Sequence, residues 1–412
     1  MAFKRKTASI IFIFITVLVD IIGIGIIIPV IPDLIISLDP SLIKLTDEEA
    51  LSKASEIGGW LMFAFAFVQF FFAPVLGELS DRFGRKPVLI MALFGLGLDY
   101  IFHAMAPTVF WLFVGRVIAG FFGASYTVAY SYIADISKPE EKAKNFGMIG
   151  AAFGLGFIIG PVVGGVAAQW GIYVPFYVAA GLSLLNMVYG LAVLPESLKK
   201  ENRRKIEIKN LVPGGALFAL RKYPQILGLV AAYFFIYLAG KSVESIWTYY
   251  TMFRFEWSVT QVGYSLGVVG ILVTIVQGGL IGRTVKFFGQ KKTILIGYIF
   301  WVSGLILFGL ANQGWMMYAF TVVYTMGGVA GPTIQSLMSN EVADDEQGEL
   351  QGALTSLVSI TTILGPPLFT FIFSYFTSDA SPISLPGASF FLGASLALVS
   401  MIFATKSLLK HH

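Results

Sequence analysis

The sequence predicts an all-α membrane protein with twelve transmembrane helices in two pseudo-symmetric six-helix halves. Three observations support this prediction. The chain of 412 residues is 56% hydrophobic and only 13% charged, which is too little charge to cover a water-soluble protein of this size. Apolar stretches recur at the length of about 20 residues that a helix needs to cross a bilayer. The chain also resembles itself when it is shifted by half its length.

The apolar stretches fall into two sets of six. The first set covers residues 8–36, 57–78, 87–106, 109–134, 146–169 and 173–194, and the second covers 223–250, 260–281, 292–310, 314–339, 351–376 and 383–406. A polar stretch rich in Lys and Arg separates the two sets. We therefore expect an N-terminal half at 1–194, a cytoplasmic linker at 195–222 and a C-terminal half at 223–412.

The distribution of basic residues predicts that both termini are cytoplasmic. With the N-terminus inside, three of the 28 Lys and Arg residues lie outside (Lys44, Lys53, Arg254), two lie within spans (Arg116, Lys241), and the others lie on the cytoplasmic side. Cytoplasmic loops of membrane proteins carry an excess of Lys and Arg, so the opposite orientation is disfavoured.

A shift of 205 residues brings similar stretches into register without gaps. The matched pairs are Gly77 with Gly282, Gly84 with Gly289, Gly123 with Gly328, Ser131 with Ser336, and Gly160-Pro161 with Gly365-Pro366. Their common order indicates a duplication. Two halves related by a parallel repeat are typical of one large class of secondary transporters, which bind substrate between the halves near the middle of the membrane.

The segment Gly77–Ile90, GELSDRFGRKPVLI, concentrates charge between two apolar stretches. Two glycines in it allow a tight turn, and Asp81 can cap a helix start and pair with nearby arginines. The second copy has Lys286 in place of Asp81 and Gln290 in place of Arg85. The segment is read either as a topology anchor or as a contact of the cytoplasmic gate. The gating candidates are Gly77, Asp81, Arg82, Gly84, Arg85 and Lys86.

The stretch GLGFIIGPVVGG leaves one face of the fifth predicted span almost without side chains. Glycines let another helix approach closely, and a proline frees a carbonyl and permits a bend. The stretch is read either as ordinary tight packing or as a hinge that seals against the opposite half. The hinge candidates are Gly156, Gly160, Pro161, Gly164 and Gly165.

Ionisable side chains within the spans are few, and such groups are costly and usually functional. At 1.5 Å per residue, Asp20 lies roughly 18 Å from the cytoplasmic end of its helix and Arg116 about 12 Å from the outer end of its own. In a hydrocarbon core of about 30 Å the two lie at nearly one depth, so we expect them to pair. Proton coupling is assigned to Asp20, Asp99 and Arg116, with a fixed structural network as the alternative for Asp99. His103 is interpreted as a packing residue.

Polar and aromatic residues on the other spans are candidates for substrate contact. Lys241 and Glu244 are three residues apart on one predicted helix, so they share a face and can pair, either as a stabilising ion pair or as a substrate contact. An aromatic and apolar lining suits a lipophilic substrate. The candidates are Gln69, Tyr126, Tyr130, Asn186, Lys241, Glu244, Trp247, Tyr250, Gln277 and Gln335.

Several of these stretches resemble the major facilitator superfamily. GELSDRFGRKPVL is similar to its motif between helices 2 and 3, GRVIAGFFGA to its buried-arginine motif in helix 4, and GLGFIIGPVVGG to the helix 5 motif of its drug:proton antiporters. DIIGIGIIIPVIPDLI and SDRFGRKPVLIMALFGLGLDY resemble the tetracycline-efflux branch, whose acids at Asp20, Asp81 and Asp99 are retained. The resemblance implies the major facilitator fold and proton-coupled efflux.

The second half departs from the tetracycline pumps that the chain resembles. Those pumps use a histidine in helix 8 and an aspartate in helix 9 for proton coupling. The matching positions, anchored on GYSLGVVGILVTIVQ and GYIFWVSG, are Val273 and Trp301. The departure puts tetracycline as the substrate in doubt, and proton coupling is expected to run through the first half.

The leading hypothesis is a monomeric, multi-pass exporter of the bacterial inner membrane that exchanges protons for a small amphipathic compound. One alternative is proton-coupled transport of a polar or carboxylate-bearing metabolite, such as a chelator bound by Lys241. Another is a non-transporting membrane sensor or scaffold. No enzyme is expected, because the sequence has no HExxH, nucleophile elbow or paired acidic metal motif, and no Walker A loop for ATP-driven pumping. The expected partners are the substrate, protons and lipid, without cofactor, metal or nucleic acid.

Overall fold

The computed structural model describes residues 2–123, 125–137, 139–203, 206, 215–343 and 346–410, and this part of the chain contains helices and no strands. The predicted linker at 195–222 lies partly outside these residues. The chain divides into two compact units. The first comprises Met1–Asp39, Ala64–Pro213 and Val259–Gly267, and the second comprises Pro40–Phe63, Gly214–Ser258 and Val268–His412.

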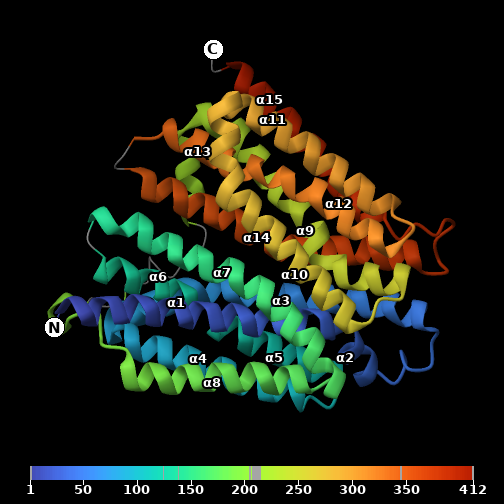
Figure 1. The fold of residues 1–412 in the computed structure, drawn as a ribbon, viewed down its shortest axis with the longest axis horizontal. Helices are drawn as coiled ribbons and strands as arrows, with labels where there is room; N and C mark the ends of the chain where they lie inside the picture. The colour runs from blue at the N-terminus through green and yellow to red at the C-terminus, as the bar shows by residue number, and fades with distance from the viewer. Residues whose placement is uncertain are drawn as a thin grey trace. The chain divides into compact units, whose positions relative to one another are not determined.

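The first unit is built on α1, which packs against both α7 and α8, while α4 packs against α8 and α5 (Figure 1). Apolar side chains of α1, α3, α4, α6 and α7 form its core. Its elements are α1 (Ala2–Ile27), η1 (Ile28–Val30), α2 (Ile31–Leu38), the second part of α3 (Asp47–Phe83), α4 (Arg85–Ala104), α5 (Val109–Phe122), α6 (Ser125–Ile136), α7 (Pro139–Ala167), η2 (Ala168–Trp170), α8 (Val174–Val193), η3 (Lys200–Asn202) and the start of α10.

The second unit is built on α9, which packs against α14 and α15, while α11 packs against α12 and α15 (Figure 1). Lys222 Nζ lies 2.9 Å from Glu349 Oε2, and its hydrogen bond to this carboxylate raises the pKa of Lys222 above its ordinary value. The elements are the first part of α3, η5 (Gly215–Lys222), η6 (Pro224–Ile226), α9 (Leu227–Phe255), the remainder of α10 (Val259–Ile275), the π-turn η7 (Val276–Leu280), α11 (Ile281–Leu310), α12 (Gly314–Met326), η8 (Gly327–Val329), α13 (Ala330–Asn340), α14 (Gln347–Thr377) and α15 (Ala388–Lys410).

Ten helical stretches in the described part are long and apolar enough to cross a membrane. One of them, Val259–Leu310, is 52 residues long and contains two of the predicted spans. The predicted span at 314–339 is divided by η8 into α12 and α13. Each of these helices alone is too short to cross a membrane. The molecule is therefore an all-helical protein with many membrane spans.

The two halves of the sequence break their helices at matching glycines. Gly84 has φ +107° and separates α3 from α4, and Gly289, 205 residues later, has φ +74° and kinks α11. Only glycine adopts this left-handed region without strain. A second matched pair also lies at helix interruptions, since Gly123 ends α5 and Gly328 lies within η8, between α12 and α13. These coincidences support the duplication that the sequence indicates.

The glycines of α7 allow the close approach that the sequence predicts. A Cβ atom added at Gly160 would meet the Cα atom of Gly25, and one added at Gly164 would overlap the carbonyl oxygen of Ile26. A third glycine, Gly165, accepts a hydrogen bond of 2.8 Å from Thr260 Oγ1 on α10, in the same unit. The helix continues through Pro161. The packing interpretation is thus realised against α1, whereas a hinge remains a hypothesis.

We predict that Gly164→Ala destabilises the protein, because the new methyl group forces α7 away from the α1 backbone. Overpacking of this kind costs roughly 1–3 kcal/mol. The thermal unfolding temperature of the purified protein measures the effect. Gly181→Ala on α8 is the matched control, since no atom lies within 4 Å of a Cβ added there. Equal unfolding temperatures for both variants would contradict the close α1–α7 contact.

Candidate functional site

Arg85, at the first position of α4, is the centre of the charged segment between α3 and α4. Its Nη1 lies 2.5 Å from Asp81 Oδ1 and donates to Ser80 Oγ at 2.6 Å, and its Nε lies 3.1 Å from Asp135 Oδ2 at the end of α6. Only 7% of Arg85 is exposed. The guanidinium therefore ties together the end of α3, the start of α4 and the end of α6 through fixed, charge-assisted hydrogen bonds.

The start of α4 is capped by a carboxylate from a distant part of the chain. Glu196, which follows α8, accepts a 2.9 Å hydrogen bond through Oε1 from the backbone N–H of Arg85. A side chain at Gly84 would collide with this carboxylate. The expectation that Asp81 caps the start of α4 is therefore wrong. Asp81 lies in the last turn of α3, and the N-cap residue of α4 is Gly84, which has no side chain that could cap the helix.

The other gating candidates have weaker ties. Lys86 Nζ donates to the carbonyl oxygen of Leu191 at 3.0 Å, and the Arg82 guanidinium lies 5.2 Å from the ring centre of Phe83. Gly77 lies inside α3, so the turn is made by Gly84 alone. In the second copy, Gln290 makes an exposed 3.2 Å hydrogen bond to Ser336 Oγ. The copy thus keeps the bend, while the residue that matches Arg85 makes a neutral hydrogen bond in place of ion pairs.

Asp20 on α1 and Ser125 on α6 form a polar cluster inside the first unit, which is called the first cluster. Ser125 Oγ donates to Asp20 Oδ2 at 2.7 Å. The other carboxylate oxygen, Oδ1, is buried and has no hydrogen-bond partner in the part of the protein that the structure describes. One oxygen of Asp20 is therefore held and the other is available.

The second cluster joins α4 to α5 through Asp99, His103 and Arg116. Arg116 Nε donates to His103 Nε2 at 2.9 Å, and His103 Nδ1 lies 2.9 Å from the backbone oxygen and 3.2 Å from carboxylate Oδ2 of Asp99. Asp99 and His103 are each 1% exposed. The guanidinium also lies 6.0 Å from the ring centre of Phe65.

The expected pair of Asp20 with Arg116 is not the arrangement in this structure. Among the described residues no ion pair within 4.0 Å joins them, because Arg116 binds His103 and Asp20 binds Ser125. An estimate of depth from the sequence does not decide which side chains meet, because the rotation of each helix about its axis and the contacts of its neighbours also decide it. His103, interpreted from sequence as a packing residue, is the group that links Asp99 to Arg116.

Lys241 and Glu244 on α9 form the predicted intrahelical pair, with Nζ 2.5 Å from Oε2. The Lys241 side chain is 11% exposed, whereas that of Glu244 is 61% exposed. The close approach of α14 to this lysine requires Gly365, where a Cβ atom would collide with the Lys241 side chain. The lysine is thus already neutralised by its own helix.

Several substrate candidates are engaged in packing contacts. Gln69 donates to the carbonyl oxygen of Gly123 at 2.9 Å, Asn186 is hydrogen-bonded to Thr16, and Gln335 donates to Gln351 at 2.6 Å. The rings of Tyr126, Tyr130 and Trp247 contact Phe153, Phe146 and Phe308, and Tyr250 donates to the Phe308 carbonyl oxygen. Gln277 is exposed within the π-turn η7, a type of local irregularity that often marks functional positions.

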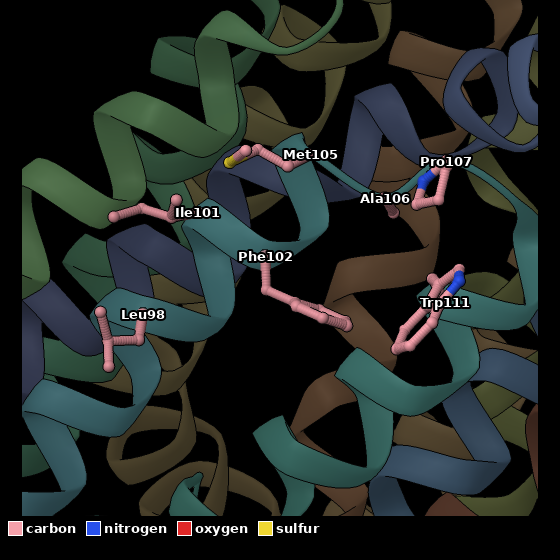
Figure 2. A pocket seen from close by; sticks show the side chains of 7 residues that line it. All are labelled: Leu98, Ile101, Phe102, Met105, Ala106, Pro107 and Trp111. Carbon is pink, nitrogen blue, oxygen red and sulfur yellow. The ribbon is translucent and has the colours of Figure 1, made fainter.

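A pocket of about 520 Å³ lies at the C-terminal end of α4 (Figure 2). Figure 2 shows the Phe102 ring directed toward Trp111, and their ring centres are 5.7 Å apart. The lining is apolar and contains none of the residues predicted from sequence: Leu98, Ile101, Phe102, Met105, Ala106, Pro107 and Trp111. Phe102 is adjacent in sequence to His103, so the pocket lies beside the second cluster.

Sequence reasoning missed Ser125, Asp135 and Glu196. Ser125 is a small hydroxyl residue in an apolar helix and carries no signal by itself. Asp135 and Glu196 received no role from the sequence, although Asp135 directly follows the predicted span at 109–134 and Glu196 is the second residue after the predicted span at 173–194. The signal that could have identified Asp135 and Glu196 is an acidic residue at the end of a span, on the same side of the membrane as a basic motif.

We predict that Arg85→Lys destabilises the protein by roughly 1–3 kcal/mol, because a lysine has no rigid guanidinium to place separate N–H donors against Asp81 and Asp135. Thermal unfolding measures the loss. Gln290→Ala, the repeat-related position in the second unit, is the matched control and is expected to change stability by less than about 0.5 kcal/mol. An unfolding temperature of Arg85→Lys equal to that of the control would show that the network is dispensable.

Comparison with known proteins agrees with this architecture. The family model described as Major Facilitator Superfamily matches residues 13–285 and 229–411. The chain is 37% identical over 386 residues to the class C tetracycline resistance protein of Escherichia coli, covering 94% of this chain and 93% of that protein. It is 36% identical over 371 residues to the class H tetracycline resistance protein of Pasteurella multocida, covering 89% of each chain.

Solved structures share the fold at low sequence identity. The human organic anion transporter MFSD10 (TETRAN) superposes with a TM-score of 0.71 at 20% identity, covering 97% of this chain and 99% of that one. The nucleoside transporter NupG superposes with a TM-score of 0.73 at 15% identity, covering 98% and 99%. The sequence matches and the shared fold lead to one conclusion: this chain belongs to the Major Facilitator Superfamily and is a membrane transporter, not an enzyme.

Proposed function

We propose that this transporter exports a small amphipathic compound in exchange for protons. It works by alternating access between two halves of six helices, residues 1–194 and 223–412, which the linker at 195–222 joins. Both termini are cytoplasmic, and the protein functions as a monomer in a bacterial inner membrane.

The observation that carries this proposal is the pair of ionisable clusters in the first unit. A carboxylate in the middle of an apolar helix is energetically costly, and such a group is usually functional. Asp20 keeps Oδ2 in a hydrogen bond with Ser125 and leaves Oδ1 without a partner in the described part of the protein. A proton can therefore be added at Oδ1 without breaking an existing hydrogen bond, which suits a group that binds and releases a proton in every cycle.

The similarity to tetracycline resistance proteins supports efflux but does not identify the substrate. The matched proteins from Escherichia coli and Pasteurella multocida are tetracycline resistance proteins. Val273 on α10 and Trp301 on α11 stand where the tetracycline pumps are expected to carry coupling residues. We therefore propose tetracycline as the first probe, and other lipophilic amphipathic compounds as the substrate class.

The alternative of a carboxylate-bearing metabolite depended on Lys241 as a free cation. Because Glu244 neutralises Lys241 at 2.5 Å, this alternative is less well supported. A sensor or scaffold predicts no substrate-dependent flux, so any flux in proteoliposomes decides against it.

We predict that Asp20→Asn abolishes coupled transport, because asparagine keeps the hydrogen bond from Ser125 but cannot carry a proton. In proteoliposomes that contain a pH-sensitive dye, proton movement driven by tetracycline or another transported probe falls at least about tenfold. Thr321→Ala is the control, since its hydroxyl only donates to the carbonyl oxygen of Met317 on its own helix. Coupled flux that persists in Asp20→Asn at the control rate would refute proton coupling through Asp20.

The proposed orientation is testable because the chain contains no cysteine. Single substitutions Ser197→Cys and Ser381→Cys place one thiol at each expected side of the membrane. In intact cells an impermeant maleimide should label the second variant alone, and permeabilised cells should label both. Labelling of Ser197→Cys in intact cells would reverse the orientation.

A further inference from the structure

Glu244 is an exposed carboxylate in the interior of α9, a membrane-spanning helix of the second unit. Its side chain is 61% exposed, although the next three residues, Ser245, Ile246 and Trp247, are at most 3% exposed. Charged side chains within spans avoid lipid and face a water-filled cavity or other parts of the protein. The exposure of Glu244 therefore indicates a part of α9 that water, and hence a dissolved compound, can reach.

The face of α9 that carries Glu244 borders other helices of the second unit. Gly240 and Tyr237, four and seven residues earlier, share this face. A Cβ atom added at Gly240 would lie 3.5 Å from Cζ2 of Trp301 on α11. A Cβ atom added at Gly331 on α13 would lie 3.4 Å from the Tyr237 hydroxyl. The carboxylate is thus on the side of α9 that α11 and α13 approach.

Aromatic side chains from three helices lie near this carboxylate. Glu244 interacts electrostatically with the hydroxyl groups of Tyr237 on α9 and Tyr324 on α12. The rings of Tyr324 and Trp301 meet edge to face, with 5.9 Å between their centres. The faces of such rings attract organic cations. The region therefore combines one exposed anion with rings that also favour a positive charge.

The cation of the Lys241–Glu244 pair is much less accessible than the anion. Lys241 Nζ lies 2.5 Å from Glu244 Oε2, and the lysine side chain is only 11% exposed. Its stem is covered by α14, because a Cβ atom added at Gly365 would lie 2.4 Å from Lys241 Cβ. A compound that reaches the pair therefore meets the carboxylate before the ammonium group.

We propose that Glu244 selects the charge of the transported compound by binding the cationic group of an amphipathic substrate. The carboxylate keeps Lys241 as one partner and takes the substrate cation as the second. Tyr237, Trp301 and Tyr324 contact the cation and the apolar part that carries it. The proposal rests on the export function proposed above and names its substrate class as lipophilic organic cations. Compounds whose only charge is negative are disfavoured at this site.

The charges of the pair give the physical reason for this preference. A carboxylate has two oxygens and can accept two cationic partners at once. The Lys241 ammonium repels a second cation, so it lowers the affinity for the substrate without abolishing it. An anion would have to displace the exposed carboxylate before it could reach Lys241. The affinity for a cation should therefore fall when Glu244 is neutralised and rise when Lys241 is neutralised.

The test measures binding of radiolabelled tetraphenylphosphonium, a lipophilic cation, to the full-length protein in nanodiscs. At about pH 8 a glutamate in contact with water is ionised. Glu244→Gln should weaken binding at least about tenfold, and Lys241→Met should strengthen it at least about threefold. An ion pair that only stabilises the fold would weaken binding in both variants. Weaker binding in Lys241→Met therefore overturns the proposal.

A second comparison avoids the unpaired lysine that Glu244→Gln leaves in the protein. Removing one partner of a buried ion pair is strongly destabilising, so Lys241→Met is combined with Glu244→Gln. The double variant should bind tetraphenylphosphonium at least about tenfold more weakly than Lys241→Met alone. Thr321→Ala, whose hydroxyl donates within its own helix, should bind like the wild type. Equal affinities of the double variant and Lys241→Met, or no saturable binding to the wild type, would overturn the proposal.

The binding measurement is independent of proton coupling, so the two proposals can fail separately. Cation binding that depends on Glu244, in a protein that moves no protons with its substrate, contradicts proton-coupled export and supports the role of Glu244. Coupled transport of tetracycline that depends on Asp20, together with cation binding that ignores Glu244, contradicts the role of Glu244 alone.

Discussion

A charged atom in hydrocarbon can be satisfied only by the protein itself, and the first unit is arranged around this constraint. Asp99, His103 and Arg116 form one connected chain, and Asp20 is held by Ser125. Gly115 and Gly23 leave room for the His103 ring and the Tyr100 hydroxyl. The small residues around the clusters are therefore as necessary as the charges, because a side chain at either glycine would displace a polar partner.

At the charged segment, the partners of Arg85 come from three places in the chain. Arg85 binds Ser80, Asp81 and Asp135 by its side chain and Glu196 by its backbone N–H. The repeat-related bend at Gly289 also has a positive φ, and Gln290, the residue that matches Arg85, makes a neutral hydrogen bond there. The bend is thus set by glycine, whereas the network of Arg85 depends on a residue that the second copy replaces.

Helical spans, the breaks at glycines and the Lys241–Glu244 pair could be predicted from the sequence, because each depends on neighbours within a few residues. The partner of Arg116 could not be predicted, since depth is one coordinate and the rotation of each helix about its axis is another. The cap of α4 was missed for a related reason: Glu196 is 111 residues from Arg85 in the chain. Contacts that depend on helix rotation or on distant segments require the fold.

The π-turn at Val276–Leu280 affects how this helix is compared with its relatives. A π-turn holds one residue more than an α-turn, so residues after it are rotated about the helix axis relative to a regular helix. Aligning α10 with a helix that lacks the turn requires a one-residue gap within Val276–Leu280. Val273 precedes the turn, so its match to the histidine of the tetracycline pumps does not depend on that gap. The face on which Gln277 lies does depend on it.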